Sequence, residues 1–167
     1  MDTSTITLVN FPRSGSFYIK SLIDDLFPKV NFQWTHNVYG FKMSNCFTLL
    51  RRPNQCIPSW IAFHKVGNKT LSQRLPDVIK WYERFMTNAL ESKTLFFCFD
   101  NLIQNPQNLI NYLSATTKQT ENKLSTKHYN KNCNTNKYEV LLDSDLRLDK
   151  SFMLYEKAKL RSLEQSL

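Results

Sequence analysis

Residues 6–26 read ITLVNFPRSGSFYIKSLIDDL, and this stretch decides the fold. An apolar, β-rich run over 6–11 ends at Pro12, and Gly15 follows in a short polar turn. Apolar side chains then recur at the spacing of a helix, at Ile19, Leu22, Ile23 and Leu26. At the start of such a helix, the first N–H groups have no intrahelical acceptor and lie at the positive end of the helix dipole. The stretch therefore predicts an anion site formed by the backbone of residues 13–18.

Strands and helices alternate along much of the chain. The expected strands are 6–11, 31–35, 46–50 and 94–99. The expected helices are 16–26, 55–66, 72–92 and 105–115. This alternation is typical of an α/β fold with a parallel sheet flanked by helices on both faces, and we expect one compact domain over 1–167.

Three further segments complete the expected organisation. The helix over 72–92 carries an apolar stripe that we assign to core packing, at Val78, Trp81, Tyr82, Phe85 and Ala89. Residues 116–137 are rich in Lys, Asn and Thr and predict a flexible basic loop or lid. A C-terminal helix is expected over 149–163.

The turn after the first strand differs from the P-loop that binds nucleoside triphosphates. That motif needs Lys directly after its second Gly, followed by Ser or Thr for magnesium. Here Gly15 is followed by Ser16 and Phe17, and the cation, Arg13, precedes the Gly. The run P-R-S-G-S instead resembles the phosphosulfate-binding loop of sulfotransferases that use 3'-phosphoadenosine 5'-phosphosulfate (PAPS), roughly P-[KR]-S-G-[ST]-[ST]. Taken by itself, the run also suits an ordinary strand-to-helix turn with a capping serine.

Two later segments resemble the same family. Residues 47–60 read FTLLRRPNQCIPSW, and the matching sulfotransferase element has R-[ND]-P with a Ser eight residues after the Arg, the spacing of Arg51 and Ser59. Residues 99–102, F-D-N-L, stand where many sulfotransferases have Y-E-D-L. The chain departs from the family at Arg52, where Asn or Asp is usual, and at Pro58. It also lacks the late R-K-G-x-x-G-x-W segment, because no Gly follows Gly67.

The resemblance implies a P-loop-like, sulfotransferase-like fold and transfer of a sulfuryl group from PAPS to a hydroxyl or amine acceptor, such as a glycan or a small molecule. It implies that Arg51 and Ser59 hold the 3'-phosphate and that Tyr18 and Phe99 provide aromatic faces for the adenine. The residues expected to bind PAPS are Arg13, Ser14, Gly15, Ser16, Phe17, Tyr18, Arg51, Ser59 and Phe99. Lysines of the basic loop are candidates to replace the charge of the missing segment, at Lys127, Lys131 and Lys137.

His36 is the candidate catalytic base. Thr35-His36 resembles the end of the K-T-H triplet in cytosolic sulfotransferases, with Trp34 in place of the Lys. A free imidazole titrates near neutral pH and so can accept a proton at cellular pH. An ordinary hydrogen-bonding histidine is the alternative, and His64 and His128 are assigned structural or surface roles. If the base is a carboxylate, Asp24 and Asp25 are the first residues to test. Arg13 is the second catalytic residue that the resemblance implies, as the cation at the leaving phosphate.

The composition limits the class of protein. A net charge of +8 attracts anionic ligands, which suits PAPS but also nucleic acids. Two alternatives therefore remain: a P-loop nucleotide or phosphate transferase, and a non-catalytic basic nucleic-acid-binding protein that uses the lysines of 118–137. Four cysteines without a C-x-x-C pair predict a reducing compartment and no metal. We find no signal peptide and no apolar run of membrane-spanning length, and we expect a soluble, cytoplasmic protein with no membrane partner and no nucleic-acid partner.

Overall fold

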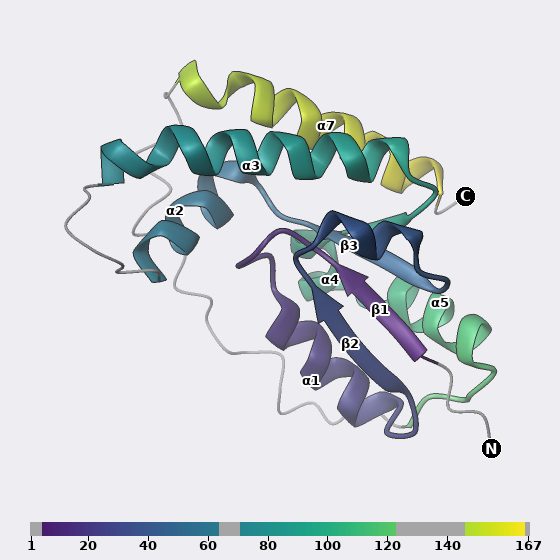
Figure 1. The fold of residues 1–167 in the computed structure, drawn as a ribbon. Coiled ribbons are helices and arrows are strands. Elements are labelled where there is room, and N and C mark those ends of the chain that lie inside the picture. Colours follow the sequence, from purple (N-terminus) through teal and green to yellow (C-terminus); the bar gives the residue numbers. More distant parts are fainter. Residues whose placement is uncertain (1–4, 64–70, 123–145, 166–167) are drawn as a thin grey trace.

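A four-stranded sheet forms the centre of the computed structural model, which describes residues 5–63, 71–122 and 146–165 (Figure 1). The strands are β1 (Thr5–Val9), β2 (Asn31–Thr35), β3 (Cys46–Leu50) and β4 (Leu95–Cys98). They lie in the order β2-β1-β3-β4, and every neighbouring pair is parallel. The α/β class with a parallel sheet flanked by helices is therefore confirmed.

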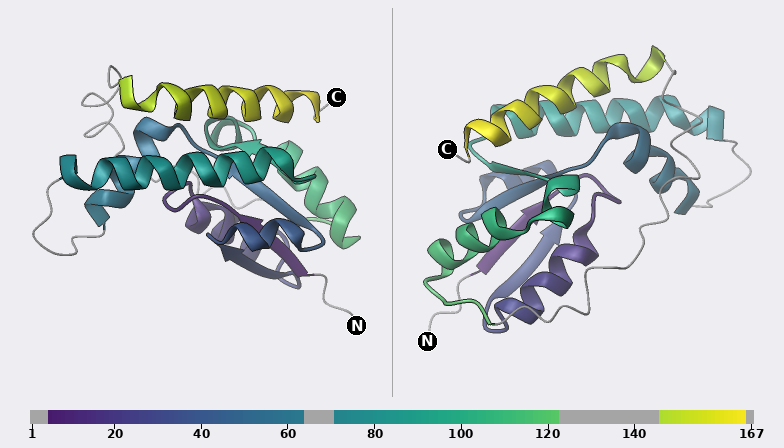
Figure 2. Two further views of the ribbon diagram at one scale, coloured as in Figure 1. Left: turned by 45° about the horizontal axis from the view of Figure 1, so that its top comes forward. Right: turned by 180° about the vertical axis from the view of Figure 1, so that it is seen from behind.

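Side chains alternate between the two faces of the sheet, and a separate hydrophobic cluster lies on each. Val9, Leu50 and Phe96 point to one face, where they pack with residues of α2 (Pro53–Phe63), α3 (Leu71–Glu91) and α7 (Asp149–Glu164). The opposite face carries Ile6, Leu8, Phe47 and Leu49, which pack with α1 (Ser16–Leu26), α4 (Phe99–Gln104) and α5 (Gln107–Thr117). Figure 2 shows these two helical layers from two further directions. Strands buried on both faces explain the nearly continuous apolar runs in the sequence.

The stripe on α3 packs in the core as expected, because Val78, Tyr82, Phe85 and Ala89 are all buried. Trp81 is only partly buried and packs at the edge of this cluster.

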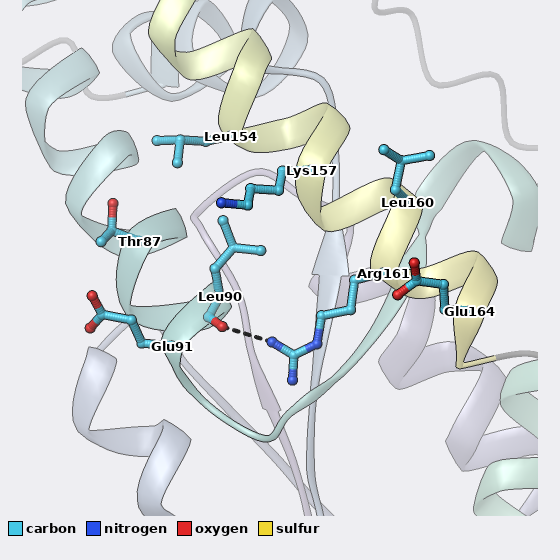
Figure 3. Close-up of a pocket in the computed structure, with 8 residues that line it drawn as sticks. All are labelled: Thr87, Leu90, Glu91, Leu154, Lys157, Leu160, Arg161 and Glu164. Carbon is cyan, nitrogen blue, oxygen red and sulfur yellow. Dashed lines mark hydrogen bonds between the residues drawn. The ribbon is translucent and has the colours of Figure 1, made fainter.

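Helix α7 lies beside α3 and closes the outer edge of the sheet. The guanidinium of Arg161 donates to the carbonyl oxygens of Leu90 and Ser92, at 2.7 Å each, and lies 5.2 Å from the centre of the Phe96 ring. Figure 3 shows Arg161 reaching the end of α3, beside a cavity of about 540 Å³ between the two helices. The Gln165 side chain accepts from the N–H of Phe96 at 3.0 Å and donates to the Thr94 carbonyl at 3.3 Å. The exposed edge of β4 is thus partly occupied by side-chain hydrogen bonds.

Several element boundaries differ from those expected. β1 ends at Val9, and the carbonyl of the next residue, Asn10, is a partner of the His36 imidazole. α2 begins at Pro53, whose fixed φ suits the first position of a helix. Phe99 was expected to end a strand, but it begins α4, where Asp100 lies favourably in the first helical turn. A 3-10 helix, η1 (Val38–Lys42), which the sequence did not predict, leads from β2 towards β3.

The C-terminal part agrees with expectation where it is described. α7 follows the short helix η2 (Leu146–Leu148) and spans Asp149–Glu164, close to the expected 149–163. The expected basic loop begins inside α5, which ends at Thr117, and its residues from 123 onward lie outside the described part of the chain. No helix in the described residues is long and apolar enough to cross a membrane.

Candidate functional site

The order of the strands creates a crevice at one edge of the sheet. The chain leaves β1 for β2 on one side, whereas β3 lies on the other side of β1. In parallel α/β sheets, ligands bind at such a switch point, beyond the carboxyl ends of the strands. A cavity of about 670 Å³ lies there. Its walls are formed by Pro12, Arg13, Gly15, Ser16, Phe17, Tyr18, Trp34, His36, Arg51, Trp60, Phe63, Trp81 and Phe99.

Eight of the ten predicted site residues line this cavity, and Ser14 and Ser59 do not. Ser14 is buried, with 1% of its surface exposed. Ser59 contacts a residue of the cavity wall, because its hydroxyl oxygen accepts a hydrogen bond from Arg13 Nε at 3.2 Å. The predicted residues from four separate loops therefore come together.

The loop after β1 has a backbone that is strained at one residue and requires glycine at another. Arg13 has a φ of 65° and Gly15 a φ of 107°, both in the left-handed region. A Cβ atom on Gly15 would overlap the ring of Phe99. The loop therefore lies directly on the Phe99 ring, and α1 begins at the next residue.

The N-terminus of α1 lines the cavity, but the Ser16 hydroxyl there is engaged by another side chain. The Ser16 hydroxyl oxygen lies 3.0 Å from the Asn10 side-chain amide nitrogen and makes its hydrogen bond there. Asn10 is fully buried, so the pair fastens the start of α1 to the end of β1. What the loop presents to an anion is thus chiefly backbone N–H groups and the helix dipole.

Arg51 connects the loops that follow β1 and β3. Its Nη1 donates to the carbonyl of Arg13 at 2.7 Å, and its Nε donates to Gln55 Oε1 at 3.2 Å. The guanidinium lies 5.1 Å from the centre of the Phe99 ring, and 9% of the residue is exposed. These contacts within the described chain use two of the five N–H donors of the guanidinium. Arg51 is therefore both a structural tie and a cation on the cavity wall.

Arg13 lies across the cavity mouth against α2. Besides the bond to Ser59, its guanidinium lies 4.8 Å from the centre of the exposed Phe63 ring. The sequence predicted that Ser59 would act with Arg51 on one phosphate. In the structure, the Ser59 hydroxyl accepts a hydrogen bond from the Arg13 side chain. Arg51 donates instead to the main-chain carbonyl of Arg13.

His36 is half-buried on the cavity wall, and its neighbour fixes its tautomer. Its Nδ1 lies 2.8 Å from the carbonyl oxygen of Asn10. A carbonyl oxygen only accepts hydrogen bonds, so this contact places the proton on Nδ1. In the neutral ring, Nε2 then carries the lone pair that a general base needs.

The two aromatic residues expected at the adenine differ in accessibility. Phe99 is 3% exposed and is covered by Gly15 and Arg51. Tyr18 meets it edge-on, with ring centres 5.7 Å apart, and its hydroxyl donates to the Leu102 carbonyl at 3.2 Å. Phe17 is 75% exposed at the mouth, and its ring centre lies 5.9 Å from that of Trp34.

Sequence reasoning missed one wall of the cavity. Trp60 and Phe63 come from α2, and Trp81 comes from α3, where it had been assigned to the core. Trp60 and Trp81 meet edge to face, with ring centres 5.3 Å apart. A signal was present, because Ser59 and Phe63 are four residues apart and so share a helix face with the predicted site.

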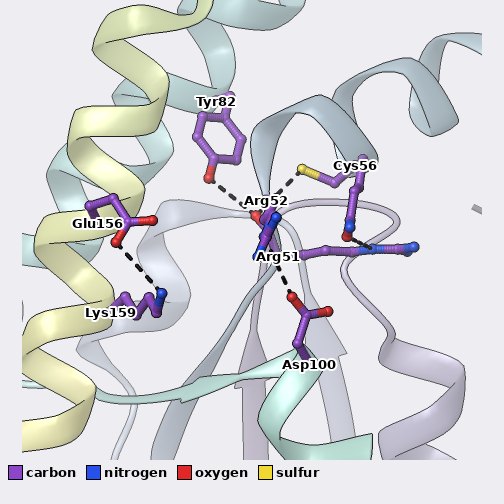
Figure 4. A network of polar contacts seen from close by, with 8 residues as sticks. Arg51, Arg52, Cys56, Tyr82, Asp100, Glu156 and Lys159 are labelled. Carbon is purple, nitrogen blue, oxygen red and sulfur yellow. Dashed lines mark hydrogen bonds and ion pairs between the residues drawn. The ribbon is translucent and has the colours of Figure 1, made fainter. Parts of the chain in front are cut away.

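Two buried polar side chains contact the main-chain carbonyl of Arg51. The Tyr82 hydroxyl donates to the Arg51 carbonyl at 3.3 Å, and the Cys56 thiol lies 3.9 Å from the same oxygen (Figure 4). Burial raises the pKa of the Cys56 thiol to about 12, and burial also raises the pKa of Tyr82. Both groups therefore stay protonated and hold the backbone at the end of β3. Nearby, Arg52 lies 3.6 Å from the Asp100 carboxylate, and Figure 4 shows this pair as well.

The remaining candidates do not line the cavity or lie outside the described residues. Asp24 forms an ion pair of 2.5 Å with Lys20 on the surface of α1. His64, His128 and the three lysines proposed to replace the missing segment lie outside the described residues. Within the described residues, no group of three or more His, Cys, Asp and Glu side chains is arranged to hold a metal ion.

Comparison with known proteins found no relative. No family model, curated protein or solved structure matches this chain. Function is therefore inferred from the sequence motifs and from the geometry of the cavity.

Proposed function

We propose that this protein is a sulfotransferase-like enzyme that moves a sulfuryl group from PAPS to a hydroxyl or amine acceptor. The observation that carries the proposal is the meeting of Arg13, Arg51 and the N-terminus of α1 at one cavity on the β1–β3 switch point, with His36 on its wall. The sequence motifs support it, because the loops that form this cavity are the ones that resemble sulfotransferase elements.

The donor would be held by its two anionic ends. The backbone of residues 13–18 and the start of α1 suit the 5'-phosphosulfate, since both present N–H groups and positive potential. Arg51 has N–H donors left for the 3'-phosphate, and a planar guanidinium suits a phosphate because it can donate two parallel hydrogen bonds. The net charge of +8 favours the approach of such a donor.

The reaction is an in-line displacement at sulfur. The acceptor oxygen forms a new S–O bond, the S–O bond to the 5'-phosphate breaks, and 3'-phosphoadenosine 5'-phosphate (PAP) leaves. His36 Nε2 takes the proton of the acceptor hydroxyl, while Nδ1 stays bonded to Asn10. Arg13, exposed at the cavity mouth where it donates to Ser59, neutralises the charge that develops on the leaving phosphate. Positioning and electrostatics supply the rate, as in phosphoryl transfer.

Thermal stabilisation by PAP, AMP and ATP tests the proposal. PAP at a hundred times its dissociation constant should raise the free energy of unfolding by about 2.7 kcal/mol. AMP lacks the 3'-phosphate and should give a smaller shift at the same concentration. A PAP shift no larger than that of AMP overturns the proposal. A larger shift with ATP and magnesium favours the phosphate-transferase alternative, and strongly salt-dependent binding of DNA or RNA favours the nucleic-acid alternative.

A further inference from the structure

A groove of about 540 Å³ lies between α3 and α7, and none of its lining residues lines the switch-point cavity (Figure 3). Three leucines line this groove, Leu90 from α3 and Leu154 and Leu160 from α7. The proposed transfer reaction gives the groove no role.

Helix α7 has one apolar face that the fold buries and a second that it leaves exposed. Tyr155 and Ala158 are buried against the rest of the molecule. Met153 and Leu160 lie on another face, because they are seven residues, or about two helical turns, apart. Of their surfaces, 63% and 61% are exposed. Large apolar side chains beside a leucine-lined groove are stabilised when another surface covers them.

Two opposite charges flank Leu160 on this exposed face. Lys157 lies three residues before it and Glu164 four residues after it, and both side chains are exposed and line the groove. Seven residues of helix separate their Cα atoms by about 10 Å, which is too far for them to pair with each other. Within the described residues, neither side chain forms an ion pair. A partner with both signs of charge would therefore suit this face.

A second copy of α7 satisfies both charges at once. If the copy runs antiparallel and a twofold axis passes near Leu160, each Lys157 lies opposite Glu164 of the partner subunit, and the two Leu160 side chains meet at the axis. A parallel copy would place like charges opposite each other. A nucleic acid fits less well despite the net charge of +8, because two carboxylates, Glu91 and Glu164, line the groove.

We propose that the chain forms a twofold-symmetric dimer through antiparallel contact of the α7 helices, with Leu160 of each subunit packed at the α3–α7 groove of the other. This dimer does not depend on the proposed function. The contact is confined to one helix pair and the groove beside it, so the interface is small, and we expect a dissociation constant of about 10 μM. Among the described residues, none that lines the switch-point cavity lies on α7, so the dimer leaves that cavity open.

Sedimentation equilibrium of the full chain tests the proposal. As the concentration increases, the apparent mass should rise from that of the 19.7 kDa chain to twice that value. Leu160→Asp should stay monomeric at about 100 μM, because it places two carboxylates at the twofold axis. Its thermal midpoint in dilute solution should match that of the wild type, since Leu160 is 61% exposed. Ile103→Asp is the matched control, because Ile103 is an exposed apolar residue of α4, and this variant should dimerise like the wild type.

Exchange of the two charges tests the antiparallel register. Lys157→Glu places a carboxylate opposite Glu164 of the partner subunit and should raise the dissociation constant about tenfold. Glu164→Lys should have a similar effect, because it places two lysines opposite each other. The double variant Lys157→Glu with Glu164→Lys restores opposite charges with their signs exchanged. It should dimerise within about threefold of the wild type.

Three results would overturn the proposal. The first is a wild-type chain that keeps the monomer mass up to about ten times the expected dissociation constant. The second is dimerisation unchanged by Leu160→Asp, which would move the contact to another surface, such as the β2 edge of the sheet. The third is a double charge variant that associates no better than the single variants, which would contradict the pairing of Lys157 with Glu164.

Discussion

His36 and Asn10 are joined by a hydrogen bond of 2.8 Å between the imidazole Nδ1 and the main-chain carbonyl. The same Asn10 holds Ser16 through its side-chain amide, and its N–H donates to the Thr35 carbonyl at 3.2 Å. One buried residue thus sets the direction of the candidate base, the start of α1 and the spacing of β1 and β2. The base and the anion-binding loop are positioned by a common anchor.

We expect His36→Asn to abolish most of the transfer while preserving the fold. The Asn side-chain amide can still donate to the Asn10 carbonyl, but it has no lone pair able to accept a proton. Loss of a general base lowers the rate about 10²- to 10⁴-fold. Transfer of ³⁵S from labelled PAPS to a panel of hydroxyl and amine acceptors measures the loss, and stabilisation by PAP should remain, because His36 does not bind the nucleotide in the proposal. Wild-type transfer by His36→Asn would remove His36 as the base.

Gly15→Ala should destabilise the protein by about 2–4 kcal/mol, because a left-handed backbone and a close contact act together. Gly15 has a φ of 107°, and a Cβ there would overlap the Phe99 ring. Urea denaturation of Gly15→Ala measures the cost. Adding Phe99→Leu should recover part of it, since the smaller side chain relieves the contact but not the backbone strain. A single variant as stable as the wild type would show that the loop does not need glycine.

Local sequence patterns predicted the architecture well. The strand, turn and helix over residues 6–26 have signals that are close together in the chain: an apolar run, a Pro, a Gly and a helical repeat. The carboxyl-edge rule for parallel sheets then placed the loops of Arg13, His36 and Arg51 at one site. These predictions required only local periodicity and one general rule of topology.

Side-chain partnerships across the cavity were less predictable. The spacing of Arg51 and Ser59 suggested that they act as a pair, but Ser59 binds Arg13, because the direction of each side chain depends on how α2 lies against the first loop. Trp81 fits a core stripe by periodicity, and only the packing of α3 on α2 leaves part of it at the cavity. Local patterns in one amino-acid sequence do not determine the side-chain contacts between elements that are distant along the chain.

Arg13→Ala should weaken PAP binding about 10- to 100-fold with little loss of stability. Arg13 is exposed, so its removal should change the free energy of unfolding by less than about 1 kcal/mol, whereas loss of a charge-assisted contact to phosphate costs about 1.4–2.8 kcal/mol of binding. Calorimetric titration with PAP measures the change.

Arg52→Ala is the matched control for Arg13→Ala. It removes the same charge from the same region, but Arg52 is paired with Asp100 and does not line the cavity. Its PAP affinity should stay within about twofold of the wild type, because the ion pair is half exposed and of small energetic value. Equal weakening by both variants would mean that general positive potential, and not a contact from Arg13, attracts the nucleotide.

Alkaline pH should destabilise the protein through the buried thiol behind Arg51. The pKa of Cys56 is about 12 in the folded protein because of burial, compared with about 9.0 for an unperturbed thiol. Between these values the unfolded chain loses the proton and the folded protein keeps it, so the free energy of unfolding falls by up to about 1.4 kcal/mol per pH unit, with no loss below pH 9 from this group.

Urea denaturation from pH 8 to pH 11 should therefore show a shallower decline for Cys56→Ala than for the wild type. Cys46→Ala is the control for the loss of a cysteine, since Cys46 is only partly buried and does not contact the Arg51 carbonyl. Parallel curves for the wild type and Cys56→Ala would show that the Cys56 thiol does not remain protonated in the folded protein at high pH.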